Sequence, residues 1–574
     1  MIEPQPHGGR LPAGSEACSA ICRTLESLGV RHVFGVPGTQ NVALFEALRR
    51  SSLTTIVPTH ELAATFMAGA YYRASGRPGV VATIGGPGLA YAIAGLAEAR
   101  LDSAALVYLV NARPADAIVG YGLQALDQRA LLAPVVKAVL TSSGHEPIAE
   151  VLRRAFEIAT TGEPGPVAIE LGGDGDQPCS PAPQSTCRRE HLRDVATLLW
   201  QRIASARRPL LMLGQGAIAS AHEIKALAER LGAPVLTTPS ARGIIAESHP
   251  LALGFDVLKG TLPRANELLA TSDLVVVLGA KLGHNGSAGF GLELPPGKTV
   301  RVDTSAEALT AVYPGRHTLC ADVAAFLAHP AAKSVGASDW TASEIARWRA
   351  RIGTTATTEP EPNIAGQPAR TFFDGLRAAL PDAGMLVTDT GMHQVLSRRY
   401  YEVRSPRGLL APSDFQSMGF GLPAAIAAKL ADPSRSIVAL LGDGGFRMTG
   451  FELGTAIKAK LSLPVIVFND GKLNQIRLQQ LAQYGTSSST DLGPLDFARF
   501  ADAMGIAHCR TGRLHAEMIG KALSAGQPTL IEVPVGDSMA VTAGALRATA
   551  ARQARTLLPQ AWKQRLAALR PARP

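Results

Sequence analysis

Two short apolar runs joined by a helical segment constrain this chain's fold more than any other feature. Ser436–Leu441 and Leu463–Phe468 have the length and composition of buried parallel strands, and Phe451–Lys460 has a helical pattern. Such a unit places the carboxyl ends of both strands at one edge of a parallel sheet. Asp443 follows the first strand and Asp470 follows the second. We therefore expect these two acids to lie side by side.

The residue types after these strands are suited to a metal and a phosphate group. Mg²⁺ takes few protein ligands, prefers oxygen, and is often completed by phosphate oxygens. Gly444 and Gly445, directly after Asp443, allow backbone N–H groups to approach a diphosphate closely. A Gly-Asp-Gly turn alone is common in ordinary α/β proteins. The complete segment, from the first strand to Asp470, is much more specific.

Motifs near the N-terminus point in the same direction. Four such motifs are Val33–Thr39, Pro58–Ala64, Tyr71–Val80 and Gly85–Gly88. Together with Gly442–Gly445 and Asn469–Gly471, they resemble the thiamine-diphosphate-dependent enzymes of the acetolactate synthase and benzoylformate decarboxylase-like family. The resemblance covers roughly the whole chain.

The expected fold class is α/β with three domains, since strand and helix patterns alternate along most of the chain. Two similar open parallel-sheet domains that bind thiamine are expected to flank a central Rossmann-like domain. The predicted boundaries are residues 15–171 for the pyrimidine-binding domain, 188–330 for the central domain, 368–536 for the diphosphate- and Mg²⁺-binding domain, and 537–574 for a basic tail. Stretches rich in Gly, Pro and polar residues separate the domains.

The resemblance implies a role for each of several residues. Glu61 would hydrogen-bond the aminopyrimidine ring of the cofactor, and Met418 would lie under the cofactor as an apolar wedge. Taken alone, Glu61 could be an ordinary acid at a helix start, and Met418 an ordinary core residue. The implied metal ligands are Asp443, Asp470 and the backbone oxygen of Lys472, and the implied cofactor contacts also include Gly38, Gly391, His393, Gly444 and Gly445.

The resemblance also indicates the reaction. It implies decarboxylation of a 2-oxo acid and carboligation to a second carbonyl compound, with Gln124 donating a hydrogen bond to the reacting oxygen. Acetolactate synthases carry a tryptophan about where Leu478 or Gln479 stands here. A simple decarboxylase that releases an aldehyde is therefore the alternative. Because the family binds its cofactor between two subunits, a homodimer or homotetramer is expected.

A weaker motif in the central domain suggests a different class of enzyme. Gly214–Ala219 matches the GxGxxA dinucleotide fingerprint. No acid ends the next expected strand, Pro234–Thr237, where a ribose partner would stand. Lys281–Asn285 also departs from the stretch found in acetolactate synthases that bind FAD. FAD is thus not expected as a cofactor, and a nucleotide-dependent oxidoreductase is the less favoured prediction of the protein's function.

The charge and hydropathy of the chain limit the kinds of binding partner that can be expected. The formal net charge is +9, and residues 537–574 contribute much of it, with seven basic residues and one acidic residue. No nucleic-acid-binding motif accompanies this tail, so an arm packed on its own or a neighbouring subunit is favoured over nucleic-acid or lipid binding. The presence of Glu61, Asp443 and Asp470 together argues against a non-catalytic scaffold. No apolar run is long enough to span a membrane, and no signal-peptide pattern is present. A cytoplasmic enzyme is expected.

Overall fold

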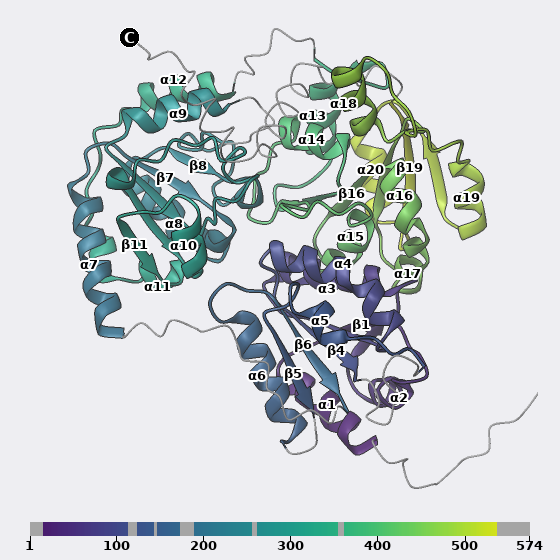
Figure 1. Ribbon diagram of the computed structural model, residues 1–574. Coiled ribbons are helices and arrows are strands. Elements are labelled where there is room, and N and C mark those ends of the chain that lie inside the picture. Colours follow the sequence, from purple (N-terminus) through teal and green to yellow (C-terminus); the bar gives the residue numbers. More distant parts are fainter. Residues whose placement is uncertain are drawn as a thin grey trace, which may run out of the picture. The chain divides into compact units, whose positions relative to one another are not determined.

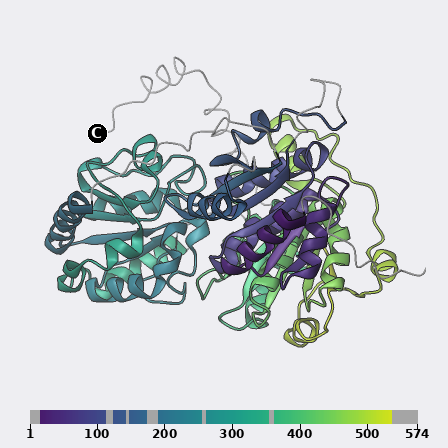
Figure 2. The same cartoon turned by 90° about the horizontal axis from the view of Figure 1, so that it is seen from below.

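The computed structural model describes residues 15–112, 123–142, 146–172, 189–254, 261–353 and 361–535 (Figures 1 and 2). The basic tail and the linker after residue 172 lie outside these ranges. The chain divides into two compact units. The first combines the N-terminal part, up to Cys187, with Pro412–Arg435 and Thr449–Leu461, and the second contains the remainder.

The first unit is built on a six-stranded parallel sheet in the order β2-β1-β3-β4-β6-β5. Its strands are β1 (His32–Gly35), β2 (Thr54–Ile56), β3 (Gly79–Thr83), β4 (Leu106–Asn111), β5 (Ala138–Ser142) and β6 (Pro166–Leu171). Its helices are α1 (Ser15–Ser27), α2 (Val42–Arg50), α3 (Glu61–Ser75), α4 (Pro87–Leu101), α5 (Gln128–Leu132) and α6 (Ile148–Thr160). Apolar residues of α1, α2 and α6 form one core with the sheet. The helices α3 and α4 lie on the opposite face (Figure 1).

Small residues allow α3 and α4 to pack closely. A Cβ atom at Gly95 in α4 would lie 1.9 Å from the Thr65 hydroxyl in α3, so any side chain there would collide. The later segment α15 (Gly421–Ala431) packs on α3 in turn, and the ring of Phe420, just before it, meets Phe66 edge to face at 5.5 Å between centroids. Thus a stretch from the C-terminal half of the chain becomes part of the first unit, which also contains η6 (Gly450–Glu452) and α17 (Leu453–Lys458).

The second unit contains two sheets. The six-stranded sheet has the order β15-β14-β16-β17-β19-β18, which repeats the strand order of the first unit's sheet. Its strands are β14 (Met385–Thr388), β15 (Leu409–Leu410), β16 (Ile437–Gly442), β17 (Pro464–Asn469), β18 (Ala507–Arg510) and β19 (Thr529–Pro534). Its helices are α13 (Ala369–Ala378), α14 (Met392–Tyr400), α16 (Asp443–Thr449), α18 (Asn474–Tyr484), α19 (Phe497–Met504) and α20 (Ala516–Leu523). This repetition confirms the expectation of two similar parallel-sheet domains.

The central domain forms the other sheet of the second unit, in the order β11-β10-β9-β7-β8. Its strands are β7 (Pro209–Leu213), β8 (Val235–Thr237), β9 (Leu274–Leu278), β10 (Thr299–Asp303) and β11 (His317–Cys320). Its helices are α7 (Arg189–Ser205), α8 (Ala221–Leu231), α9 (Leu262–Thr271), α10 (Ala306–Ala311), α11 (Val323–Leu327) and α12 (Ala342–Gly353). Every strand pair in this sheet is parallel, as expected of a Rossmann-like domain.

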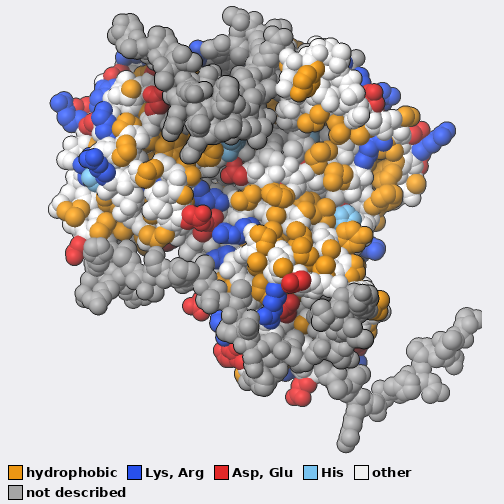
Figure 3. Space-filling view, viewed as in Figure 1, with side chains coloured by type: hydrophobic (Ala, Val, Ile, Leu, Met, Phe, Trp, Pro, Cys, Tyr) orange, Lys and Arg blue, Asp and Glu red, His pale blue; other side chains and the backbone are white. Residues whose placement is uncertain are grey.

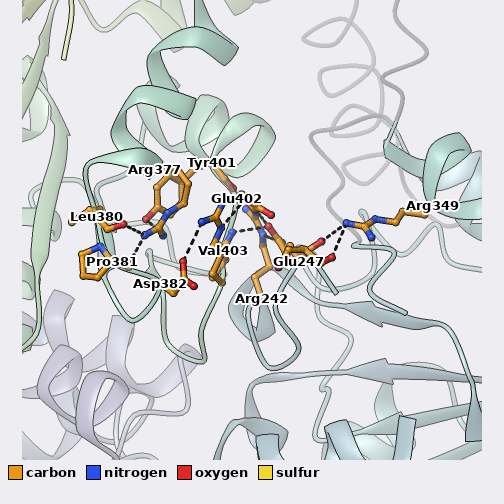
Figure 4. Close-up of polar contacts among 12 residues, drawn as sticks. Arg242, Glu247, Arg349, Arg377, Leu380, Pro381, Asp382, Tyr401, Glu402 and Val403 are labelled. Carbon is orange, nitrogen blue, oxygen red and sulfur yellow. Dashed lines mark hydrogen bonds and ion pairs between the residues drawn. The ribbon is translucent and has the colours of Figure 1, made fainter. Parts of the chain in front are cut away.

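A buried ion pair joins the central domain to the segment that follows α14 (Figure 4). Arg242 is 3% exposed and forms two hydrogen bonds with the Glu247 carboxylate, of 2.6 and 2.8 Å. The same guanidinium donates to the backbone oxygens of Arg398 and Tyr401. Glu247 in turn accepts from the backbone N–H of Val403 at 2.8 Å. These charges are paired and hydrogen-bonded, as buried charges must be.

The three strands that were expected by residue range appear as β16, β17 and β8, each within one residue of its predicted ends. The strands that the sequence did not reveal are edge strands or a two-residue hairpin: β5, β11, β15, β18, and β12 (Asn363–Ile364) with β13 (Gln367–Pro368). Within the described ranges, no helix has the length and apolar character needed to cross a membrane.

Candidate active site

Two acids stand together at the carboxyl edge of the second unit's six-stranded sheet. Gly442 at the end of β16 is in register with Phe468 of β17, so the turns after these strands are neighbours. Asp443 follows Gly442 directly and is 2% exposed, and its carboxylate accepts the N–H of Gly471 at 3.0 Å. Asp470 accepts the N–H of Lys472, also at 3.0 Å. The structure therefore brings Asp443, Asp470 and Lys472 together.

This pair of acids is electrostatically suited to a cation. Burial, followed by repulsion from Asp470, raises the pKa of Asp443 to about 6. A divalent cation between the two carboxylates would remove this repulsion. Among the described residues, no cluster of three or more His, Cys, Asp or Glu side chains is placed to hold a metal ion. A cation at Asp443 and Asp470 would thus take its other ligands from backbone or ligand oxygens, which fits Mg²⁺.

A buried histidine lies beside this edge. His393, in α14, is 3% exposed, and burial lowers its pKa to about 3. A Cβ atom at Gly391 would lie 2.8 Å from the His393 ring, and one at Gly442 would lie 3.0 Å from its Nδ1. Its Nε2 atom is buried and has no hydrogen-bond partner among the described residues. A buried polar atom without a partner fits a site completed by a ligand.

In the first unit, Glu61 is the first residue of α3 and is 9% exposed. A Cβ atom at Gly88 would lie 3.1 Å from Glu61 Oε1, so the carboxylate lies against the first turn of α4. No hydrogen bond from the described part of the chain reaches this carboxylate. The group is therefore available to a ligand.

The position of Glu61 is supported by a second buried acid. Glu452, in η6, is fully buried and accepts the backbone N–H of Thr59 at 2.9 Å and a hydrogen bond from the Thr59 hydroxyl. Its other oxygen accepts from Thr455 at 2.7 Å. Glu452 thereby fixes the segment that leads into Glu61.

Three loops meet at the carboxyl edge of the first unit's sheet. Gly38 lies in the loop after β1, where its N–H donates to the Asn41 side chain at 2.7 Å. A Cβ atom at Gly38 would lie 2.7 Å from Ile84, which follows β3. Gln124 reaches the same edge from the segment before α5, and Gln40 of the first loop donates to it at 2.5 Å. The structure thus places Gly38 and Gln124 in adjoining loops.

Met418 is half-buried, and hydrogen bonds hold its neighbours on both sides. The N–H of Ser417 donates to Glu98 Oε2 at 2.9 Å. The backbone oxygen of Gly419 accepts from the Thr449 hydroxyl, also at 2.9 Å. Gln416 has a positive φ of 61°, and its side chain donates back to the Pro412 oxygen at 2.9 Å. Asp414–Gln416 thus form a bend that the Gln416 side chain stabilises by its own hydrogen bond.

The acid that holds Ser417 belongs to a buried charged cluster. Asp102, one turn after Glu98, pairs with Arg73 and accepts hydrogen bonds from the N–H and hydroxyl of Ser413. Burial and the neighbouring Asp102 raise the pKa of Glu98 to about 7. These charged groups border a small cavity together with Phe66 and Phe420. Together they attach the segment before Met418 to α4.

Sequence reasoning missed Gln40, Glu98, Asp102 and Glu452. One signal was available for Glu98 and Asp102, which stand four residues apart at the end of an otherwise apolar helix. Buried acids at this spacing need partners. Nothing in the sequence marks Gln40 or Glu452 as a partner of Gln124 or Thr59, because these pairs meet only in the folded chain.

The GxGxxA motif has a structural explanation. A Cβ atom at Gly214 would lie 2.1 Å from the backbone oxygen of Gly279, and one at Gly216 would lie 3.1 Å from its Cα. These glycines are therefore required by contact between the loops after β7 and β9. Nearby, the buried guanidinium of Arg301 donates to the backbone oxygens of Ala280, Val312 and Tyr313. The motif alone is thus no evidence for a nucleotide.

Family models match most of the chain in three parts. The N-terminal TPP binding domain of the thiamine pyrophosphate enzymes matches residues 16–131, the central domain matches residues 197–329, and the C-terminal TPP binding domain matches residues 389–533. The first match contains Glu61 and Gln124, and the third contains His393, Asp443 and Asp470.

Relatives of the chain agree with these matches. The large subunit of acetolactate synthase isozyme 1 from Escherichia coli is 30% identical over 507 residues, which cover 85% of this chain and 88% of that protein. A probable acetolactate synthase large subunit from Methanocaldococcus jannaschii is 28% identical, with 92% and 93% covered. A probable 2-ketoarginine decarboxylase from Pseudomonas aeruginosa is 31% identical, with 80% and 83% covered. The chain therefore belongs to the thiamine pyrophosphate enzymes, in their acetolactate synthase-like group.

Proposed function

We propose that this protein uses thiamine diphosphate and Mg²⁺ to decarboxylate a 2-oxo acid and to join the remaining fragment to a second carbonyl compound. The observation that carries the proposal is the pairing of buried Asp443 with half-buried Asp470 at two adjacent strand ends, because a cation and its diphosphate complete such a site. The cofactor supplies a thiazolium carbon that adds to carbonyls and stores the electron pair released on bond cleavage.

The residues of this chain would perform the supporting tasks. Asp443, Asp470 and the Lys472 oxygen would hold the metal, while Gly391, His393, Gly444 and Gly445 would surround the diphosphate. In favour of this assignment, the buried Nε2 of His393 has no other partner in the described chain.

In the first unit, Glu61 would hydrogen-bond the aminopyrimidine and control its protonation, as a general acid or base does. Its carboxylate accepts no hydrogen bond from the described residues and lies against the first turn of α4 at Gly88, which has no side chain to cover it. Met418 would support the cofactor from below. Gln124 would donate to the substrate oxygen on which negative charge develops.

Because the family that this chain resembles binds its cofactor between two subunits, we infer that the active form is a homo-oligomer in which one subunit completes the site of another. Exposed apolar side chains support this inference. On the first unit, Val42, Tyr91, Leu123 and Phe451 are each at least 62% exposed. Apolar side chains also reach the surface on the face drawn in Figure 3.

A simple decarboxylase is the second candidate. A 2-ketoarginine decarboxylase is among the relatives, and Leu478 packs against the apolar core of the third domain where acetolactate synthases have a tryptophan nearby. That packing leaves a different pocket from that of a branched-chain biosynthetic synthase.

A panel of 2-oxo acids distinguishes the two candidates. CO₂ release would be measured for pyruvate, 2-oxobutanoate, benzoylformate and 5-guanidino-2-oxopentanoate, each with and without an added aldehyde or second 2-oxo acid. Condensed hydroxyketone products support carboligation, and free aldehyde alone supports the decarboxylase. No CO₂ from any member, in protein loaded with thiamine diphosphate and Mg²⁺, contradicts both.

A further inference from the structure

A chain of hydrogen bonds links the three loops at the carboxyl edge of the first unit's sheet. The backbone N–H of Gly85 donates to Gln40 Oε1 at 2.9 Å. Gln40 Nε2 donates to Gln124 Oε1 at 2.5 Å. The first bond comes from the turn after β3, and the second reaches the segment before α5.

The first bond fixes the direction of the second. A backbone N–H can only donate, so Gly85 must face the oxygen of the Gln40 amide. The NH₂ group of Gln40 then faces Gln124, whose side-chain oxygen must accept this hydrogen bond. The NH₂ group of Gln124 is consequently turned away, with both of its hydrogens uncommitted within the described ranges.

The backbone around Gln124 is held separately. Gln124 has a positive φ of 58°, and its backbone oxygen would lie 2.6 Å from a Cβ atom at Gly86. Gln128 Oε1 accepts the N–H of Gly86 at 3.3 Å, while its Nε2 donates to Asn111 at 3.1 Å. The loop's position therefore does not depend on Gln40 alone, whereas the orientation of the Gln124 amide does.

We propose that Gln40 is a positioning residue that sets the Gln124 amide with its NH₂ group towards the substrate. This inference rests on the proposed function, in which Gln124 faces the reacting carbonyl. A carbonyl oxygen that gains negative charge is stabilised by an N–H donor and repelled by an amide oxygen. A rotation of the Gln124 amide by about 180° would thus replace a stabilising N–H group beside the substrate oxygen with a repelling amide oxygen. Gln40 holds the amide in the stabilising orientation.

The decisive variant is Gln40→Glu. It keeps the size of the side chain and the acceptor for Gly85, but its carboxylate cannot donate to Gln124. The Gln124 amide should rotate so that its NH₂ group faces the introduced carboxylate and its oxygen faces the substrate. With the best 2-oxo acid of the panel above, kcat should fall about 10- to 100-fold at pH 8, with little change in KM.

Protonation of the new carboxyl should reverse the defect. A protonated carboxyl donates to Gln124 Oε1 again, so the ratio of variant to wild-type kcat should recover as the pH falls towards the ordinary glutamate pKa of about 4.3. Gln201→Glu, the same substitution at an exposed position of α7, is the control for added charge and should show no such recovery. The effects of Gln40→Glu and Gln124→Ala should not add in the double variant.

A second readout does not depend on turnover. In apoprotein carrying ¹⁵N-labelled glutamine side chains, the Gln124 NH₂ signal is identified by its loss in Gln124→Ala. Its hydrogens should exchange with solvent more slowly in Gln40→Glu than in wild type, because they become hydrogen-bonded. Equal exchange rates, or wild-type kcat in Gln40→Glu while Gln124→Ala is slow, would overturn the proposal. A fully active Gln124→Ala would instead refute the role of Gln124 in the proposed function.

Discussion

The carboxylate of Glu98 accepts the backbone N–H of Ser417, a residue 319 positions later in the chain. Through this bond, a helix of the pyrimidine-binding domain holds the residue directly before Met418. Asp102, the residue directly after this helix, holds Ser413. The proposed wedge under the cofactor is thus positioned by the domain that also carries Glu61.

Replacing Glu98 with Ala should loosen this attachment. The partly buried Ser417 N–H would lose its acceptor, which costs about 1–3 kcal/mol. Hydrogen exchange of residues 413–419 should become faster, and thiamine diphosphate should bind about tenfold more weakly. Glu98→Gln keeps an acceptor oxygen and should restore both. The control is Glu170→Ala, which removes a buried acid paired with Arg129 elsewhere in the first unit. Equal changes in that control would mean that general destabilisation is the cause.

The raised pKa of Glu98 predicts a pH-dependent stability. Because the folded protein binds this proton more tightly than the unfolded chain, the contribution of Glu98 is present below its ordinary pKa near 4.5. It is lost as the pH rises through about 7. The thermal midpoint of wild type minus that of Glu98→Gln should therefore fall between pH 5 and pH 8. A constant difference across this range would show that Glu98 does not titrate there.

Asp443→Ala should lose Mg²⁺ and thiamine diphosphate together, since each completes the binding site of the other. We expect at least a roughly 100-fold weaker apparent affinity for the cofactor, because even residues that only hydrogen-bond a metal ligand contribute about 10- to 100-fold. Titration calorimetry with Mg²⁺ and thiamine diphosphate measures this apparent affinity. The exposed Asp496, which caps α19, provides the control variant Asp496→Ala. Cofactor binding by Asp443→Ala at wild-type strength would place the metal elsewhere.

Glu61→Gln should leave folding and cofactor binding nearly intact and slow proton exchange at the thiazolium carbon. Acid–base assistance by a side chain contributes about 10²–10⁴-fold. Quenched deuterium exchange of the bound cofactor, followed by NMR, measures this rate. An unchanged rate would remove Glu61 from the mechanism.

The purified protein should contain no stoichiometric flavin. Gly214 and Gly216 are accounted for by their contact with Gly279, and the guanidinium of Arg301 already binds three backbone oxygens. The visible absorption spectrum tests this expectation. One flavin per chain would require these residues to rearrange, and would show that the central domain binds a nucleotide.

Much of the fold could be predicted from local patterns. The central strands of all three sheets are continuous apolar runs because they are buried on both faces, and such runs are visible in the sequence. The strands that escaped prediction are edge strands such as β18, whose residues Ala507–Arg510 are at most partly buried. A strand with one solvent-exposed side carries a weak hydrophobic pattern.

Local pattern was enough to predict the strand–helix–strand unit that carries Asp443 and Asp470, because a parallel crossover brings the carboxyl ends of both strands to one edge of the sheet. The contacts of Glu98 with Ser417, of Glu452 with Thr59 and of Gln40 with Gln124 became visible only in the folded chain. These are polar contacts between residues 84 to 393 positions apart. A hydrogen bond needs its donor and acceptor within about 3 Å of each other, and no local sequence pattern indicates which distant residues come that close.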